Sequence, residues 1–186
     1  LPIYIVLDTS ASMCITSVSM SKYAWAVQLA AGLALVAQQR MSPVGLMGCG
    51  DKKRDLHYLP TLSKNTVLQW AHELRYYNLN ESTSLTSTLK KLSPALESNS
   101  LVLITSDLHD HDAIAAIKRL NQQHDCIVLM MQDPAEHGSV GGGIFRAREA
   151  ETGHQFIAHG RKKWLEEDKD LNELKRAGVD SLQLQT

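Results

Sequence analysis

The sequence predicts an α/β domain with a doubly wound, mostly parallel central sheet, an antiparallel edge strand and helices on both faces. Strand-like runs alternate with helical patterns along the chain, as they do where helices connect parallel strands. The runs IYIVLD, LVLITSD and DCIVLMMQD are continuously apolar and rich in branched residues, which is typical of strands buried on both faces. With 186 residues, of which 44% are hydrophobic, the chain is long enough for one domain with a full core.

Each expected element has a local reason. The opening strand ends in a polar loop, after which Ser21 can cap a long helix that ends before Pro43. The turn-like DKKR separates two short apolar runs, which favours a hairpin-like edge pair. The tripeptide ETG separates two later runs in the same way, and Gly178 can close the last helix. The expected elements are, in chain order, a strand at 3–8, a helix at 21–40, strands at 44–50 and 55–60, helices at 65–76 and 85–92, a strand at 100–107, a helix at 113–123, a strand at 125–133, a hairpin at 141–159, a helix at 162–176 and a strand at 179–185.

Charge and cysteine content limit the classes of function. The net charge is −1 and acidic and basic residues are interspersed, so we expect no nucleic acid partner. The three cysteines form no CxxC pair, which favours reduced thiols and a cytoplasmic location. No apolar stretch reaches the roughly 20 residues that span a bilayer, so we expect no membrane contact by this domain itself.

The chain begins inside a strand, at Leu1, without a methionine or a signal sequence. We therefore interpret residues 1–186 as a single domain excised from a longer chain. In that longer chain, a segment upstream of Leu1 could anchor the protein to a membrane.

Hydroxyls and carboxylates follow the expected strands. Asp8, Ser10 and Ser12 form a D-x-S-x-S pattern, in which alternate residues of an extended loop point the same way. A downstream loop adds Thr83, and Asp107 ends another strand. Ligands of doubly wound sheets bind outside the carboxyl ends of the strands, so we expect these side chains on one rim. Oxygen donors without sulfur or imidazole suit a hard cation, Mg²⁺ in the first place, with Mn²⁺ or Ca²⁺ as alternatives.

Such a site predicts recognition rather than catalysis. If the acids bind the cation through water and the hydroxyls bind it directly, the metal stays electrophilic on its open side. An Asp or Glu of a partner protein can then complete the shell. We therefore expect a protein-binding module and no enzyme, with no catalytic residues and no organic cofactor. Two alternatives stay open: a phosphoester hydrolase that uses the same acids, and a structural domain with a vestigial, metal-free site.

The polar loop SDLHDHD raises a separate possibility. Its histidines and aspartates, among them His109, could hold zinc or a second metal. We favour a simpler interpretation, a polar rim loop with an aspartate near the N-terminus of the following helix.

The segments IVLDTSASM, STSLTSTL and LVLITSD, in this order, resemble the metal-ion-dependent adhesion site of von Willebrand factor A (VWA) domains. The resemblance implies a VWA fold and a Mg²⁺ site. The loop that carries the threonine has Ser82 where the family usually has glycine, so Thr86 and Thr88 remain alternatives to Thr83, which the spacing favours. The implied ligands are Asp8, Ser10, Ser12, Thr83 and Asp107, with the aspartates bound directly or through water.

A narrower resemblance lies further along the chain. QQHDCIVLMMQDPAEHG, followed by AREAETGHQF, is similar to the bacterial family catalogued as domain of unknown function 58. Together with the opening motif, this resemblance covers essentially the whole chain. It implies an adaptor that works with a MoxR-type AAA+ ATPase.

Overall fold

Strands and helices alternate in the order that the sequence predicts. The structure, a computed structural model, describes residues 1–50, 56–77, 84–96, 99–110, 112–134, 144–148, 155–159 and 167–185. The elements are β1 (Ile3–Leu7), the 3₁₀ helix η1 (Ala11–Cys14), α1 (Lys22–Gln39), β2 (Val44–Gly48), β3 (His57–Thr61), α2 (Lys64–Arg75), α3 (Leu85–Ala95), β4 (Leu101–Ser106), α4 (Ala113–Leu120), β5 (Asp125–Gln132), β6 (Ile144–Arg148), β7 (Gln155–His159), α6 (Glu167–Arg176) and β8 (Asp180–Gln185).

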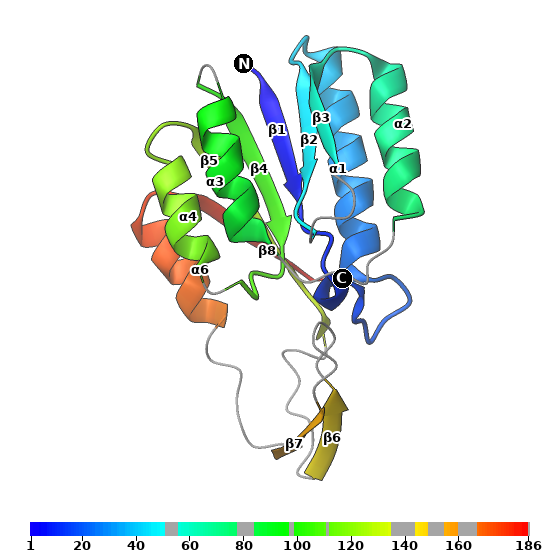
Figure 1. Cartoon of the computed structure of the whole chain (residues 1–186), viewed down its shortest axis with the longest axis vertical. Helices are drawn as coiled ribbons and strands as arrows, with labels where there is room; N and C mark the ends of the chain where they lie inside the picture. Colours follow the sequence, from blue (N-terminus) through cyan, green and yellow to red (C-terminus); the bar gives the residue numbers. More distant parts are fainter. Residues whose placement is uncertain are drawn as a thin grey trace.

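A six-stranded sheet with the order β3-β2-β1-β4-β5-β8 forms the centre of the molecule (Figure 1). Adjacent strands of this sheet are parallel, except that β3 at one edge runs antiparallel to β2. β6 and β7 pair separately as an antiparallel hairpin. The strand order reverses between β1, whose successor in the chain is β2, and β4 on its other side. This is the point at which doubly wound sheets bind ligands, and the predicted fold class is confirmed.

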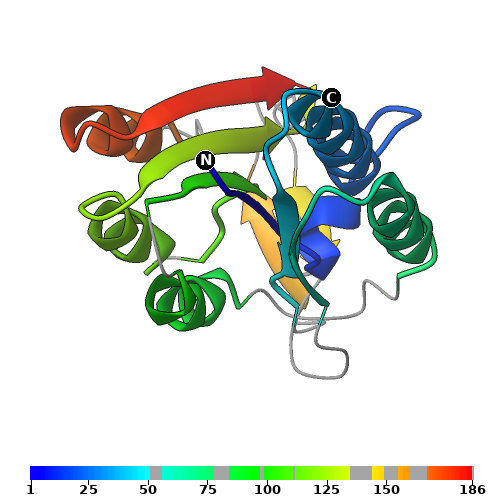
Figure 2. The same cartoon turned by 90° about the horizontal axis from the view of Figure 1, so that it is seen from above.

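Helices cover both faces of the sheet, α1 and α2 on one and α3, α4 and α6 on the other (Figure 2). β1 supplies side chains to both cores, as its continuous apolar run predicts. Ile5 and Leu7 pack on the α1 side, and Val6 packs on the α3 side. Along α1, small side chains at every fourth position are fully buried, which lets the helix lie close to the sheet. They are Ala26, Ala30 and Ala34.

Helix ends follow local signals, with two differences from the expected bounds. Ser21 caps α1 by accepting a hydrogen bond from Ala24 N at 3.1 Å, and Gly178 follows α6 with a φ of +75°. α3 continues to Ala95 although Pro94 lies in its last turn, where the proline removes the backbone hydrogen bond that residue 94 would otherwise donate. α4 ends early, at Leu120, and the side chain of the next residue, Asn121, accepts a hydrogen bond from Cys126 N and donates one to Gly178 O.

All three cysteines are unpaired thiols: Cys14 is exposed, and Cys49 and Cys126 are buried. Within the described ranges, none of the helices combines the length and the apolar character needed to cross a membrane.

Candidate metal centre

The candidate centre lies where β1 and β4 end side by side. Asp8 follows β1, Asp107 follows β4, and the two strands pair in parallel with Leu7 opposite Thr105. Ser106, the last residue of β4, donates a hydrogen bond from Oγ to Asp8 Oδ2 at 2.6 Å. Asp8, Ser106 and Asp107 are all buried. The expectation that both aspartates share one rim is therefore confirmed.

The side chains of the D-x-S-x-S loop converge, although the backbone is not extended throughout the loop as expected. Ser10 has an extended conformation, but Ser12 already lies in the helical turn η1. This turn brings the two hydroxyls together, with Ser10 Oγ and Ser12 Oγ 2.9 Å apart. Asp8 Oδ1 accepts a hydrogen bond from Ser10 N at 3.0 Å, which ties the carboxylate to the same loop. Asp8, Ser10 and Ser12 thus form one buried cluster of oxygen atoms.

Asp107 lies between two basic side chains that sequence reasoning did not identify as part of the site. Its Oδ2 is 3.0 Å from Lys22 Nζ, at the start of α1, and its Oδ1 is 2.9 Å from His109 Nδ1. Lys22 is buried, whereas His109 is half exposed. No local signal in the sequence marks either residue: a cation at the first position of a helix is disfavoured by the helix dipole, but Lys64 occupies the same position of α2 and is exposed.

A strained turn supports this arrangement. Leu108 has a φ of +57°, a left-handed conformation that is rare for a bulky residue. Its N–H donates to Ser106 Oγ at 2.9 Å, so one serine hydroxyl connects Leu108 to Asp8. Because the chain reverses direction at Leu108, the side chain of His109 lies against the carboxylate of Asp107.

The two carboxyl groups have opposite pKa shifts. Burial, and then the charge of Asp107, raise the pKa of Asp8 to about 6, while hydrogen bonds from Ser106 and Ser10 act in the other direction. Burial also acts to raise the pKa of Asp107, but His109 and Lys22 outweigh it and hold that pKa well below its usual range. Asp107 is therefore ionised. In the metal-free protein, by contrast, the cost of burying the negative charge of Asp8 is not fully offset.

These residues fit a hard divalent cation. The clustered donors are carboxylate and hydroxyl oxygens, which Mg²⁺ prefers, and a cation would stabilise the ionised form that burial disfavours at Asp8. In the part of the chain that the structure describes, no three His, Cys, Asp or Glu side chains are grouped so that they could hold a metal. The candidate centre therefore depends on two carboxylates supplemented by hydroxyls.

The threonine of the expected set, Thr83, lies outside the described residues, as does His111 of the SDLHDHD loop. The two alternatives to Thr83 have other contacts. Thr88 is buried and its side chain hydrogen-bonds to Cys49 in the core. Thr86 donates its backbone N–H to Asp110 Oδ2 at 2.8 Å and lines a groove between α3 and α4.

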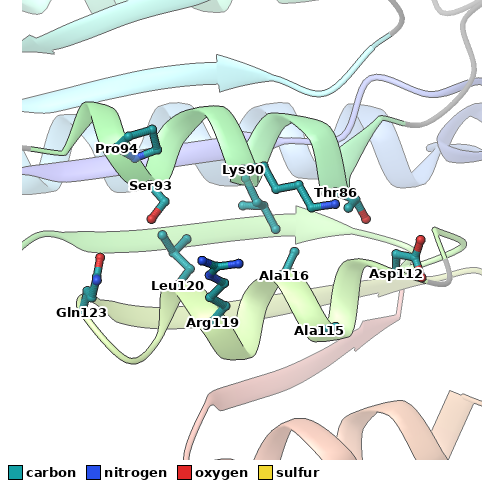
Figure 3. A pocket seen from close by; sticks show the side chains of 11 residues that line it. Thr86, Lys90, Ser93, Pro94, Asp112, Ala115, Ala116, Arg119, Leu120 and Gln123 are labelled. Carbon is teal, nitrogen blue, oxygen red and sulfur yellow. The ribbon is translucent and has the colours of Figure 1, made fainter.

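This groove, about 780 Å³ in volume, lies beside the rim. Figure 3 shows the side chains of Lys90 and Arg119 in the space between α3 and α4, with Thr86 and Asp112 at the end nearest the rim. Both helices begin at the rim, and neither contains an acidic residue. Their basic residues are Lys90, Lys91, Lys118 and Arg119.

Comparison with known proteins agrees with this fold. The family model described as "Protein of unknown function DUF58" matches residues 1–168. The chain belongs to this family. No curated protein matches this DUF58 chain.

Solved structures share the DUF58 chain's fold at low sequence identity. BatB from Bacteroides thetaiotaomicron, a conserved hypothetical protein, is 17% identical with a TM-score of 0.68, and the match covers 100% of this chain and 91% of that one. The SpRpn10 VWA domain is 11% identical with a TM-score of 0.56, and the match covers 99% and 87%. At these identities the likeness establishes a VWA-like fold.

Proposed function

We propose that this DUF58 domain is a Mg²⁺-dependent protein recognition module. The observation that carries the proposal is the buried oxygen cluster at the rim, where two neighbouring strands deliver Asp8 and Asp107 beside the Ser10 and Ser12 hydroxyls. Such a set of carboxylate and hydroxyl oxygens binds a hard cation. The VWA-like fold supports the coarser conclusion that the domain is a protein-interaction module.

Each residue has a role in this proposal. Ser10, Ser12 and Thr83 would bind the cation through their hydroxyl oxygens, and Asp8 and Asp107 would supply negative charge directly or through water. Ser106 positions Asp8 through its 2.6 Å hydrogen bond. The bound cation offers a positively charged coordination position to an outside carboxylate. An Asp or Glu of the partner protein would occupy it.

The basic groove between α3 and α4 adjoins this position and favours an acidic partner segment. Lys90 and Arg119 are exposed along the groove, whereas its acidic lining residue, Asp112, lies at the end nearest the rim. A partner that presents further acidic residues beside its metal-binding carboxylate would pair with these two side chains. The groove would then add charge complementarity to the single metal contact.

We further propose a MoxR-type AAA+ ATPase as the partner, with this domain as its adaptor in the cytoplasm. The family resemblance supports this choice, and the unpaired cysteines agree with a reducing compartment. Mn²⁺ and Ca²⁺ are the alternative cations. We propose no enzymatic activity, because the carboxylates and hydroxyls of the rim cluster are assigned as ligands of the cation.

Calorimetric titration of Mg²⁺ into the metal-stripped domain tests the proposal. The variant is Asp8→Asn, and the matched control is Asp112→Asn, which removes an exposed carboxylate near the same rim. We expect one ion to bind to the wild type and the control and none to Asp8→Asn. Capture of the candidate ATPase should then require Mg²⁺ and fail in EDTA.

Other outcomes are decisive as well. No ion binding by the wild type, even with the ATPase present, would overturn the proposal in favour of a structural domain. Turnover of p-nitrophenyl phosphate that disappears in Asp8→Asn would overturn it in favour of a hydrolase.

A further inference from the structure

Lys22 is buried although a lysine at its position is ordinarily exposed. Its side chain is only 1% exposed at the first position of α1. Burial of an ammonium ion is costly unless it is paired, and the positive end of the helix dipole adds to that cost. Lys64 has the same local context, since it begins α2 directly after the capping Ser63, as Lys22 follows the capping Ser21. Lys64 is exposed, so the helix start does not itself require burial.

The candidate metal centre supplies the compensation. Lys22 Nζ lies 3.0 Å from Asp107 Oδ2, and the other oxygen of the same carboxylate faces His109 Nδ1 at 2.9 Å. Asp107 is in turn close enough to Asp8 for its charge to raise the pKa of that carboxyl. The ammonium ion therefore belongs to the same buried charge cluster as both carboxylates that would balance a divalent cation.

We propose that Lys22 is a built-in counter-cation that keeps the metal centre weak until a partner carboxylate arrives. This inference rests on the proposed function and adds its regulation. The two carboxylates and the Lys22 ammonium, counted by themselves, carry one negative charge. A bound divalent cation leaves the cluster with one positive charge, and the carboxylate of a partner brings it to zero. Metal binding and partner binding therefore become mutually dependent, since each supplies the charge that the other needs.

The charge arithmetic also gives Lys22 a role in the metal-free protein. Without a cation, Asp8 and Asp107 are two buried carboxylates, and their mutual repulsion would oppose folding. The ammonium offsets one of them. A lysine that does this in the resting state necessarily competes with an incoming metal ion for the same negative charge.

Replacement of Lys22 with methionine tests the inference, because methionine keeps an apolar side chain of similar length and removes the charge. Mg²⁺ is titrated calorimetrically into the metal-stripped wild type, Lys22→Met, Lys22→Arg and the matched control Lys64→Met. We expect Lys22→Met to bind Mg²⁺ about tenfold more tightly or better than the wild type, because a nearby positive charge is gone. Lys22→Arg and Lys64→Met should stay close to the wild-type affinity.

Thermal unfolding with and without Mg²⁺ supplies an independent readout. We expect Mg²⁺ to raise the Tm of Lys22→Met more than that of the wild type. A Lys22→Met protein that folds only when Mg²⁺ is present also supports the inference, because the metal then replaces the missing ammonium. Failure to fold with or without Mg²⁺ would overturn it and assign Lys22 a purely structural role.

The outcomes separate this inference from the proposed function. Equal Mg²⁺ affinity of the wild type and Lys22→Met overturns the counter-cation role and leaves the metal site intact. Absence of Mg²⁺ binding in every variant overturns both. Binding by Lys22→Met where the wild type binds only in the presence of the partner supports both.

Discussion

Ionised Asp8 destabilises the metal-free domain, so Asp8→Asn should stabilise that state. The carboxyl is fully buried, and burial together with the charge of Asp107 raises its pKa from 3.8 to about 6. Because the pKa is higher in the folded than in the unfolded state, the folded protein binds more protons between these two values. The stability that Asp8 contributes is therefore fully present below about pH 4 and is lost as the pH rises through about 6.

The magnitude follows from the shift. One pKa unit corresponds to about 1.4 kcal/mol, so a shift of roughly two units amounts to about 3 kcal/mol. Slightly less than half of this loss of folding stability, about 1.4 kcal/mol, occurs as the pH rises from about 5 to about 7.5. Asp107 does not titrate in this window, because its lowered pKa keeps it ionised. Asn can accept a hydrogen bond from only one of the two donors, Ser10 N and Ser106 Oγ, at a cost of about 1 kcal/mol. At neutral pH we therefore expect a net stabilisation of about 2 kcal/mol by Asp8→Asn in EDTA.

Urea unfolding of wild type and Asp8→Asn in EDTA, at several pH values across this window, measures the effect. The difference between the two proteins cancels the titration of the eight histidines. We expect the advantage of Asp8→Asn to grow by about 1.4 kcal/mol from the acid to the neutral end of the window. A difference that stays constant or shrinks as the pH rises would contradict the raised pKa of Asp8. Free Mg²⁺ at about 100 times its Kd should then stabilise the wild type alone, by about 2.7 kcal/mol.

Three further predictions concern the hydroxyl ligands, the groove and a helix end. Ser10→Ala should lower Mg²⁺ affinity in calorimetry by about tenfold or more, because it removes one proposed oxygen ligand. Circular dichroism should remain that of the wild type, since the change removes one hydroxyl group, whose partner is Ser12 Oγ; unchanged affinity would exclude Ser10 as a ligand. Arg119→Glu should weaken Mg²⁺-dependent capture of the partner without changing Mg²⁺ affinity, whereas Lys64→Glu, on another helix, should do neither; equal capture by all three proteins would remove the groove from the interface. Gly178→Ala should lower the free energy of unfolding in urea by about 1 kcal/mol, because alanine is strained at a φ of +75° although no atom lies within 4 Å of its Cβ. A loss close to zero would show that the turn after α6 relaxes to accept a side chain.

Local sequence patterns predicted the order of the helices and strands, and they placed the two aspartates of the candidate site on one rim. The continuous apolar run at residues 3–8 required a strand buried on both faces, and Ile5 and Val6 do face opposite cores. The rule that ligands bind at the carboxyl ends of parallel strands then placed Asp8 and Asp107 on one rim, because a strand end is a property of local sequence. The convergence of the serines was predicted correctly for the wrong reason, since Ser12 reaches Ser10 through a helical turn.

The surroundings of the carboxylates could not be predicted in this way. The side chain of Ser106 lies in an apolar strand and gives no sign that it will bond Asp8, 98 residues away. Leu108 belongs to a residue type that avoids a positive φ, so its left-handed turn runs against local preference.

Lys22 and Lys64 show the division most clearly. Both follow a capping serine and begin a helix, and the local sequence accounts for this. The exposure of Lys64 and the burial of Lys22 against Asp107, 85 residues away, depend on how the chain folds. The physical reason is that helix caps depend on neighbours within one turn, whereas the burial of a charge depends on which carboxylate the fold brings within reach.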